Sequence, residues 1–210
     1  MRRIPLALKI AYTAFLAVLL PYYWATYTPW NFLYFCDIAL LLTCVGLWTE
    51  KPLLISMPAV GILLPQALWL ADLGARAITG SHITGMTAYM FDPRLPVFVR
   101  ALSSFHGWLP IVLVYAVLRL GYDRRAFLPQ AALTITLLIF CYAVGPDASA
   151  LAAHPQQAVN VNYVFGLDDH QAQSWMSPLL WLALLMVVYV VVFCAPTHLL
   201  LKRFAPPRMQ

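Results

Sequence analysis

Residues 178–201 read PLLWLALLMVVYVVVFCAPTHLLL, a run that contains no Asp, Glu, Lys or Arg. A segment of about 20 predominantly apolar residues is long enough, as a helix, to cross a hydrocarbon layer about 30 Å thick. A helix that is apolar on all sides has to be surrounded by protein or by lipid. This stretch therefore predicts a membrane-spanning helix.

The composition extends this prediction to the whole chain. Hydrophobic residues make up 62% of its 210 residues and charged residues only 10%, whereas soluble domains contain roughly 45–50% and about 25%. The mean hydropathy is +0.77, and a soluble fold would expose apolar surface at a cost of about 25 cal/mol per Å². These values exclude a soluble domain, a disordered chain, a disulfide-stapled module and a coiled coil. They predict an all-α polytopic membrane protein.

Six apolar segments are long enough to span the membrane. We expect one transmembrane domain over residues 1–210, with helices at about 4–24, 31–48, 53–73, 97–120, 127–144 and 178–201. The mixed segments 74–96 and 145–177 are predicted to be long loops. Arg2 and Arg3 before an apolar core resemble the start of a signal peptide, but no small-x-small cleavage site follows. We therefore expect an uncleaved first helix.

Basic residues are distributed unevenly around these six spans. If the N-terminus is inside, ten of the 13 Lys and Arg residues lie on the cytoplasmic side and three on the other. The positive-inside rule therefore predicts that both termini are cytoplasmic and that both long loops face outward. The net charge of +5 is explained by membrane orientation, and no nucleic-acid partner is predicted. The ten are Arg2, Arg3, Lys9, Lys51, Arg119, Arg124, Arg125, Lys202, Arg203 and Arg208, and the three are Arg76, Arg94 and Arg100.

Two ionisable side chains inside the predicted spans, Asp37 and His106, are the strongest candidates for chemistry. Placing each of these side chains inside the membrane costs at least about 2.5–3.5 kcal/mol, so the presence of each needs an explanation. At 1.5 Å per helical residue they lie about 8 and 15 Å below the outer surface, where they can meet in one bundle. Asp37 points about 100° away from the adjacent Cys36. That direction suits orienting His106, or capping a loop, better than sharing the face of Cys36.

The thiol of Cys36 is a candidate nucleophile if a neighbouring imidazole takes its proton. The same imidazole can instead activate water or a lipid hydroxyl. Gly107, next to His106, is expected to let another backbone approach the imidazole closely. Each residue also has a structural alternative: a small buried thiol for Cys36, an interhelical hydrogen bond for His106, and an interfacial or capping carboxylate for Asp37.

The remaining polar residues give weaker signals. Asp72 and Asp92 lie at a helix end or in a loop, where a structural role is favoured. The triplet Asp168-Asp169-His170 contains metal-ligand types, but long loops contain such triplets by chance, so no metal or cofactor site is predicted. Four cysteines lie in apolar stretches without CxxC or CxxH spacing, which indicates neither a disulfide framework nor a zinc site.

Several motifs resemble one family. The segment 31–41, NFLYFCDIALL, resembles the Cys-Asp-Leu-Ala helix of the YwaF-like integral membrane proteins. Residues 91–93 and 104–107 (FDP and SFHG) are similar to the loop and the Phe-x-x-His-Gly helix of that family. Residues 160–163, NVNY, are similar to its Asn-x-Asn-Tyr segment. The order and approximate spacing agree across about 130 residues.

This family is distantly related to the androgen-induced-gene-like lipid hydrolases and to a mammalian ether-phospholipid transmembrane acyltransferase, six-helix enzymes with a Thr or Cys nucleophile and an intramembrane His. The resemblance implies that Cys36 is the nucleophile and His106 the base, with Asn162 as a polar support. It implies hydrolysis or transfer of an acyl ester, with membrane lipids as partners, in a bacterial cell membrane. Tyr163, Asp72 and Asp92 join Asn162 as candidate substrate-binding residues.

Two non-enzymatic functions remain open. The chain can be a transporter or small-molecule carrier in which Asp37 and His106 handle protons or a ligand, or an assembly factor whose loops bind a partner. An enzyme or carrier would need an outward-opening polar pocket between the second, fourth and sixth helices. Asp37 and Asn162 would then orient the site or stabilise a developing oxyanion.

Overall fold

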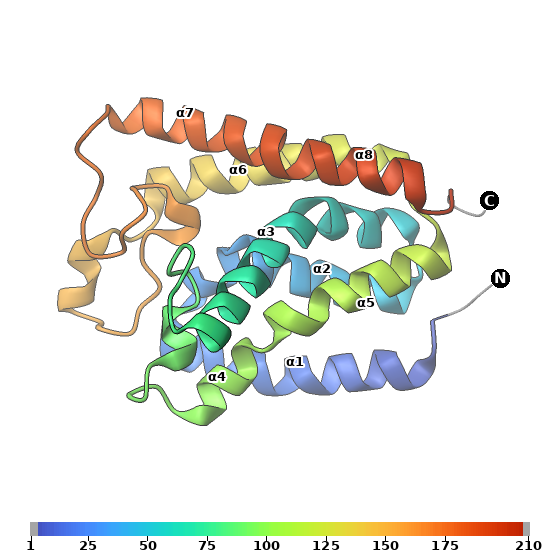
Figure 1. Cartoon of the computed structure of the whole chain (residues 1–210), viewed down its shortest axis with the longest axis horizontal. Coiled ribbons are helices and arrows are strands. Elements are labelled where there is room, and N and C mark those ends of the chain that lie inside the picture. Colours follow the sequence, from blue (N-terminus) through green and yellow to red (C-terminus); the bar gives the residue numbers. More distant parts are fainter. Residues whose placement is uncertain (1–3, 208–210) are drawn as a thin grey trace.

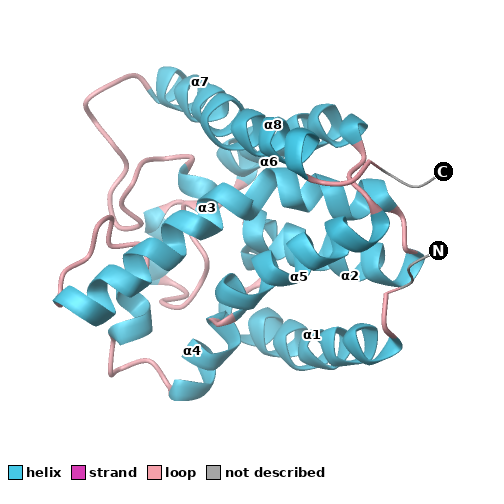
Figure 2. Cartoon of the chain, turned by 45° about the vertical axis from the view of Figure 1, so that its right-hand side comes forward, coloured by secondary structure: helices cyan, strands magenta, loops and turns pink. Residues whose placement is uncertain are grey.

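Helices run the length of the molecule in the computed structural model, which describes residues 4–207 (Figure 1). Five are long and apolar enough to cross a membrane and a sixth, α2, is shorter. Residues 4–207 contain no β-strand, as Figure 2 shows. The chain is therefore an all-α, multi-pass membrane protein. Its helices are α1 (Leu6–Tyr27), α2 (Phe35–Thr49), α3 (Pro52–Thr79), α4 (Val97–Ser103) with α5 (Phe105–Leu120), α6 (Phe127–Val144), and α7 (Pro178–Val188) with α8 (Ala195–Phe204).

The two long loops lie at the end of the molecule opposite the first turn of α1 and the last turn of α8 (Figure 1). We call the loop end the outer end. This arrangement agrees with the predicted placement of both long loops on one side. Two of the basic residues assigned to the opposite side form ion pairs. Lys9 pairs with Glu50 at 2.6 Å, and Arg125 pairs with Asp123 at 2.8 Å. Arg2, Arg3 and Arg208 of the predicted basic set lie outside the described residues.

Short helical turns fill parts of the connections. They are η1 (Pro29–Leu33), η2 (Ala88–Phe91), η3 (Arg124–Ala126), η4 (Ala148–Ala152) and η5 (Val161–Tyr163), all of the 3-10 type. Two predicted boundaries differ from the observed ones by more than three residues. The second span begins at Phe35 rather than at residue 31, because Tyr34 adopts an extended backbone between η1 and α2. The third span continues beyond residue 73 to Thr79, where Gly80 ends the helix at a φ of 77°.

The last helix contains an irregularity that the sequence did not predict. Between α7 and α8, residues 189–194 form a π-helical segment, η6 (Tyr189–Cys194). Such segments occur frequently at functional sites. Here the Tyr189 hydroxyl donates a hydrogen bond to the carbonyl oxygen of Gly61 at 3.0 Å, and its ring centroid lies 4.3 Å from that of Phe35. The segment therefore connects the last helix to α3 and to the start of α2.

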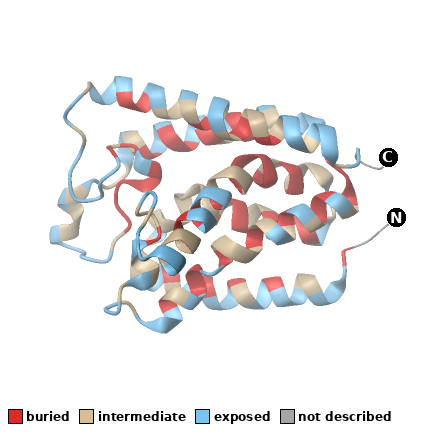
Figure 3. Ribbon diagram, in the orientation of Figure 1, coloured by how far each residue is buried: buried red, intermediate tan, exposed pale blue. Residues whose placement is uncertain are grey.

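The buried residues lie on the faces that the helices turn toward one another (Figure 3). Helix α3 is central, since it packs against α2, α5, α6 and α8. The outward faces carry large apolar side chains that remain exposed, as expected where lipid replaces water. In the last helix these exposed residues are Leu179, Leu180, Leu184, Val187, Val191, Val192, Leu199, Leu200 and Phe204.

Two glycines contribute differently to this packing. A Cβ atom at Gly46 on α2 would lie 2.7 Å from Ile55 Cδ1 and 3.1 Å from the backbone carbon of Leu54 on α3. A Cβ atom at Gly107 would meet only Leu70 Cδ2, at 3.7 Å, an ordinary contact. The expectation that Gly107 admits a close backbone was therefore wrong. Gly46 has this role, at the contact of α2 with α3.

Replacing Gly46 by Ala is expected to force α2 away from α3 and to lower the free energy of unfolding by about 1–3 kcal/mol, the usual cost of overpacking. Gly107→Ala is the matched control and should change stability little. Thermal unfolding of the purified variants in a mild detergent measures both. Equal midpoints for the two variants would contradict this account of the α2–α3 contact.

Candidate functional site

Asp37 and Cys36 lie in the first turn of α2. The thiol of Cys36 donates a hydrogen bond to Asp37 Oδ2, with a distance of 3.6 Å between the two atoms. The Asp37 side chain is buried, with the residue only 4% exposed, and its Oδ1 has no hydrogen-bond partner within the described part of the chain. An unpaired buried acceptor costs about 1–3 kcal/mol. Packing alone does not explain why a carboxyl group occupies this position.

Asn162 holds this first turn in place from the outer loop. Its Oδ1 accepts a hydrogen bond from the backbone N–H of Phe35 at 3.0 Å, and its Nδ2 donates to the carbonyl oxygen of Leu33 at 2.9 Å. The residue before the helix, Tyr34, supplies no side-chain cap. Asn162 therefore acts as the N-terminal cap of α2 from a distant part of the sequence. The structure places this predicted site residue against the backbone of Phe35, the residue before Cys36.

Tyr163 contributes through its backbone. Its φ is 64°, and its carbonyl oxygen accepts a hydrogen bond from the indole Nε1 of Trp181 at 2.8 Å. This bond ties the outer loop to α7. The preceding Asn162 also has a positive φ, of 61°, so the backbone of this pair turns sharply where it meets α2.

His106 lies on α5, immediately after the helix is interrupted at Ser104. Its Nδ1 is 2.9 Å from Nε2 of Gln66 on α3. The imidazole stacks on Phe105, with ring centroids 4.2 Å apart, and lies 5.0 Å from the ring of Trp69. Two aromatic rings and one amide therefore fix the orientation of the imidazole.

Cys36 and His106 form hydrogen bonds to other partners than the prediction expected. Among residues 4–207, the thiol of Cys36 is bonded to Asp37 and the imidazole of His106 to Gln66, with no hydrogen bond that joins the two candidates. The expectation that Asp37 orients His106 was therefore wrong. Gln66 has that function, because α3 packs against α5 and turns this amide toward the imidazole. Its signal in the sequence was an amide within an otherwise apolar span.

Asp72 is fully buried near the outer end of α3 and binds its own loop. Its two oxygens accept hydrogen bonds from the segment that follows the helix. The donors are the backbone N–H groups of Ile83, Thr84, Gly85 and Thr87, the hydroxyl of Thr87, and Nδ1 of His82. These contacts occupy the carboxylate, so we assign Asp72 to anchoring the loop instead of binding substrate.

Asp92 is also engaged locally. Its carboxylate accepts hydrogen bonds from the guanidinium of Arg94, at 2.8 Å for the Nη2–Oδ2 pair, and from the backbone N–H of the same residue at 2.9 Å. These hydrogen bonds hold the pKa of Asp92 below its ordinary value. The predicted substrate-binding carboxylate is therefore charged and paired within its own turn.

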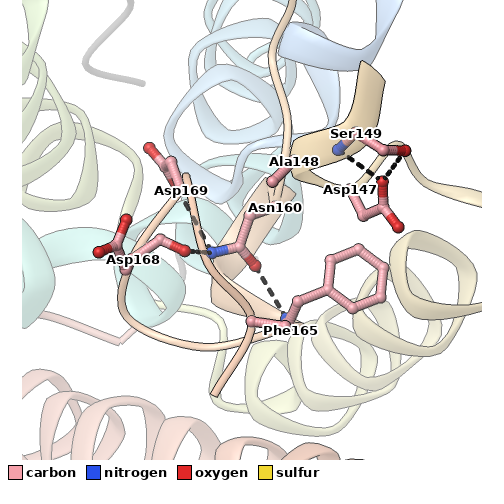
Figure 4. Close-up of a pocket in the computed structure, with 8 residues that line it drawn as sticks. Asp147, Ala148, Ser149, Asn160, Phe165, Asp168 and Asp169 are labelled. Carbon is pink, nitrogen blue, oxygen red and sulfur yellow. Dashed lines mark hydrogen bonds between the residues drawn. The ribbon is translucent and has the colours of Figure 1, made fainter. Parts of the chain in front are cut away.

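Two hollows open beside the segment 145–177. Figure 4 shows Asn160 in the centre of the first, between Asp168 and Asp169 on one side and Asp147 on the other. The amide of Asn160 donates to the carbonyl oxygen of Gly166 at 2.9 Å and accepts from the backbone N–H of Phe165 at 2.8 Å. The first hollow has a volume of about 110 Å³ and the second, beside Trp175 and Trp181, about 260 Å³.

Neither hollow is lined by Cys36, Asp37 or His106. Over residues 4–207 no group of three or more His, Cys, Asp or Glu side chains is placed to hold a metal ion. Comparisons of the chain with family models, with curated proteins and with solved structures find no match. The candidate site thus consists of Cys36 and Asp37, held by Asn162, and His106, held by Gln66.

Asn162→Ala is expected to destabilise the protein by about 1–2 kcal/mol, the cost of removing a helix cap, and to speed alkylation of Cys36 by a maleimide. The exposed loop residue His154 provides the control variant, His154→Ala, which should leave both quantities unchanged. Thermal unfolding and mass spectrometry of the alkylated protein measure the two effects. Identical behaviour of both variants would show that Asn162 does not hold the first turn of α2.

Asp72→Ala removes the acceptor for the loop 80–96, which should then be cut faster by an added protease. Asp92→Ala, in the same loop, removes an ion pair and one backbone hydrogen bond, both to Arg94 two residues away, and should have a much smaller effect. Limited proteolysis followed by mass mapping of the fragments tests this difference. Equal cleavage rates in the two variants would contradict the anchoring role of Asp72.

Proposed function

We propose that this protein is a membrane enzyme that hydrolyses or transfers the acyl group of a membrane lipid in the outer half of the bilayer. The observation that carries the proposal is the Cys36 thiol, which donates to a buried carboxylate whose second oxygen has no partner. A thiol becomes a good nucleophile only when a base takes its proton. The resemblance to the YwaF-like family supports the same assignment.

The location of the pair fits an ester substrate. Asp37 is the third residue of α2, which places it roughly 4.5 Å along the helix from its outer end at 1.5 Å per residue. The ester groups of phospholipids lie close below the headgroups, at a similar depth. The polar loop that carries Asn162 and Tyr163 lies against this helix end and is available for contacts with a headgroup.

The chemistry proceeds in two balanced steps. The proton of Cys36 passes to a base, and the sulfur attacks the ester carbonyl carbon. The acyl carbon–oxygen bond breaks, and the departing lipid oxygen takes up a proton. Water or a second lipid hydroxyl then attacks the thioester, which releases a fatty acid or forms a new ester and returns the proton to sulfur.

In the assignment we propose, Asp37 is the immediate acceptor of the thiol proton, because it is the group to which the thiol is bonded. His106 serves water, the lipid hydroxyl or the leaving group, since its hydrogen bond is made elsewhere. A version with water as the nucleophile needs only His106. Basic residues at the end opposite the long loops, together with the family resemblance, support a bacterial cell membrane with both termini in the cytoplasm.

A second function is favoured by the same carboxylate. Buried Asp residues inside membrane domains often mark proton pathways, and Asp37 is buried with one oxygen that has no hydrogen-bond partner among the described residues. A proton-coupled transporter would use Asp37 without needing Cys36 as a nucleophile. The two functions therefore make different predictions for the thiol.

Lipid profiling of cells that express the wild type, Cys36→Ala or His106→Ala at matched membrane levels tests the proposal. We expect the wild type to change a phospholipid or lysophospholipid pool and each variant to reduce the underlying rate by about 100-fold or more, as for loss of a nucleophile or base. Cys44→Ala on the same helix is the matched control and should behave as the wild type.

If only His106→Ala lost activity, the nucleophile would be water and not the Cys36 thiol. Identical lipid profiles for the wild type and all variants would overturn the enzyme assignment and leave the transporter. A proton-flux assay in proteoliposomes with Asp37→Asn then tests that second function.

A further inference from the structure

The contact between Gln66 and His106 indicates which nitrogen of the imidazole carries hydrogen. The amide nitrogen Nε2 of Gln66 lies 2.9 Å from Nδ1 of the imidazole. An amide NH₂ group only donates hydrogen bonds, so Nδ1 has to accept. A neutral imidazole that accepts at Nδ1 carries its hydrogen on Nε2.

We infer that Gln66 sets the tautomer of His106 and holds the resting imidazole as a proton donor at Nε2. The tautomer follows from the orientation of the Gln66 amide, with Nε2 toward the ring, whereas its catalytic consequence rests on the proposed acyl chemistry. In this state His106 can donate to an ester carbonyl or a leaving oxygen, but Nε2 has no lone pair with which to act as a base.

The surroundings show that the amide is held on one side only. Gln66 is 3% exposed, and its Oε1 is buried without a hydrogen-bond partner in the described part of the chain. The rings of Phe105 and Trp69 keep the imidazole in place. No other side chain of residues 4–207 forms a hydrogen bond to this ring, so Gln66 alone selects its tautomer.

The Oε1 atom of Gln66, which has no partner, makes a second hydrogen-bonded state of His106 possible. If the amide turns by 180°, and Nε2 of the imidazole gives its hydrogen to water or a leaving oxygen while Nδ1 takes one from water, Oε1 accepts the Nδ1 hydrogen and Nε2 is left with a free lone pair. His106 can then take a proton at Nε2 from water or a lipid hydroxyl, and the resulting imidazolium keeps its Nδ1–H bonded to Oε1. Gln66 is in this sense a positioning residue that switches His106 between donor and base.

The nitrogen-15 NMR spectrum of histidine-labelled protein in lipid nanodiscs tests the inference without any lipid assay. At pH 8 an imidazole with an ordinary pKa of about 6.5 is neutral, and protonated and bare ring nitrogens resonate far apart. The chain has five histidines, and His106→Ala identifies the signal of interest. We expect Nδ1 of His106 to be bare and Nε2 to carry hydrogen in the wild type.

Gln66→Glu replaces the donor by a carboxylate that only accepts, so the hydrogen should move to Nδ1 and the two resonances should exchange places. Gln66→Leu removes both partners and should give shifts averaged between the tautomers. Gln130→Glu, which changes another buried glutamine bonded to Thr134, is the matched control and should leave the His106 signals unchanged.

A wild-type spectrum with hydrogen on Nδ1, or a Gln66→Glu spectrum identical to the wild type, would overturn the inference. Failure of the proposed function is distinguished because it affects only lipid turnover. If turnover exists, Gln66→Leu should lower its rate by about tenfold with unchanged thermal stability, and Gln66→Glu should alter its pH profile. If no turnover exists, the tautomer assignment still stands or falls on the spectra.

Discussion

The site depends on a hydrogen-bonded clamp between parts of the chain 127 residues apart, in which Asn162 binds the first turn of α2. This helix has only 15 residues, fewer than the roughly 20 that a full crossing needs. The N–H groups of its first turn need acceptors from elsewhere in the chain. The outer loop supplies them, and Cys36 and Asp37 are positioned as a consequence.

Hydrocarbon offers no hydrogen bonds, so buried polar groups have to find partners within the protein. Most do so here: Tyr189 bonds to Gly61, and Asp72 binds its own loop. Five buried side-chain atoms of the described residues have no hydrogen-bond partner: Thr28 Oγ1, Asp37 Oδ1, Gln66 Oε1, Arg100 Nε and Gln130 Oε1. Two of them, Asp37 Oδ1 and Gln66 Oε1, belong to groups in contact with a candidate catalytic side chain. We interpret these two oxygens as the places where a substrate, or a change of rotamer, completes the site.

The general fold could be predicted from the sequence because the length of each apolar segment is a local signal. The helix ends were less predictable, since the break at Tyr34 depends on its backbone conformation and the extension of α3 to Thr79 carries polar residues. The site was predicted in part. Residue types marked Cys36, Asp37 and His106, but their partners depend on how each helix is rotated. The Gln66–His106 pair and the carboxylate-bound loop at Asp72 therefore could not be predicted.

The proposed acyl chemistry requires that the sulfur of Cys36 form a covalent bond to a lipid acyl group at the outer end of α2. The most direct measurement is acyl capture: the purified protein in nanodiscs is incubated with a phospholipid whose acyl chain carries an alkyne tag, and Cys36 is then examined by mass spectrometry. The account predicts a tag on Cys36 that neutral hydroxylamine removes, as expected for a thioester. A protein that remains untagged at Cys36 while Asn162 and Asp37 are intact would contradict it.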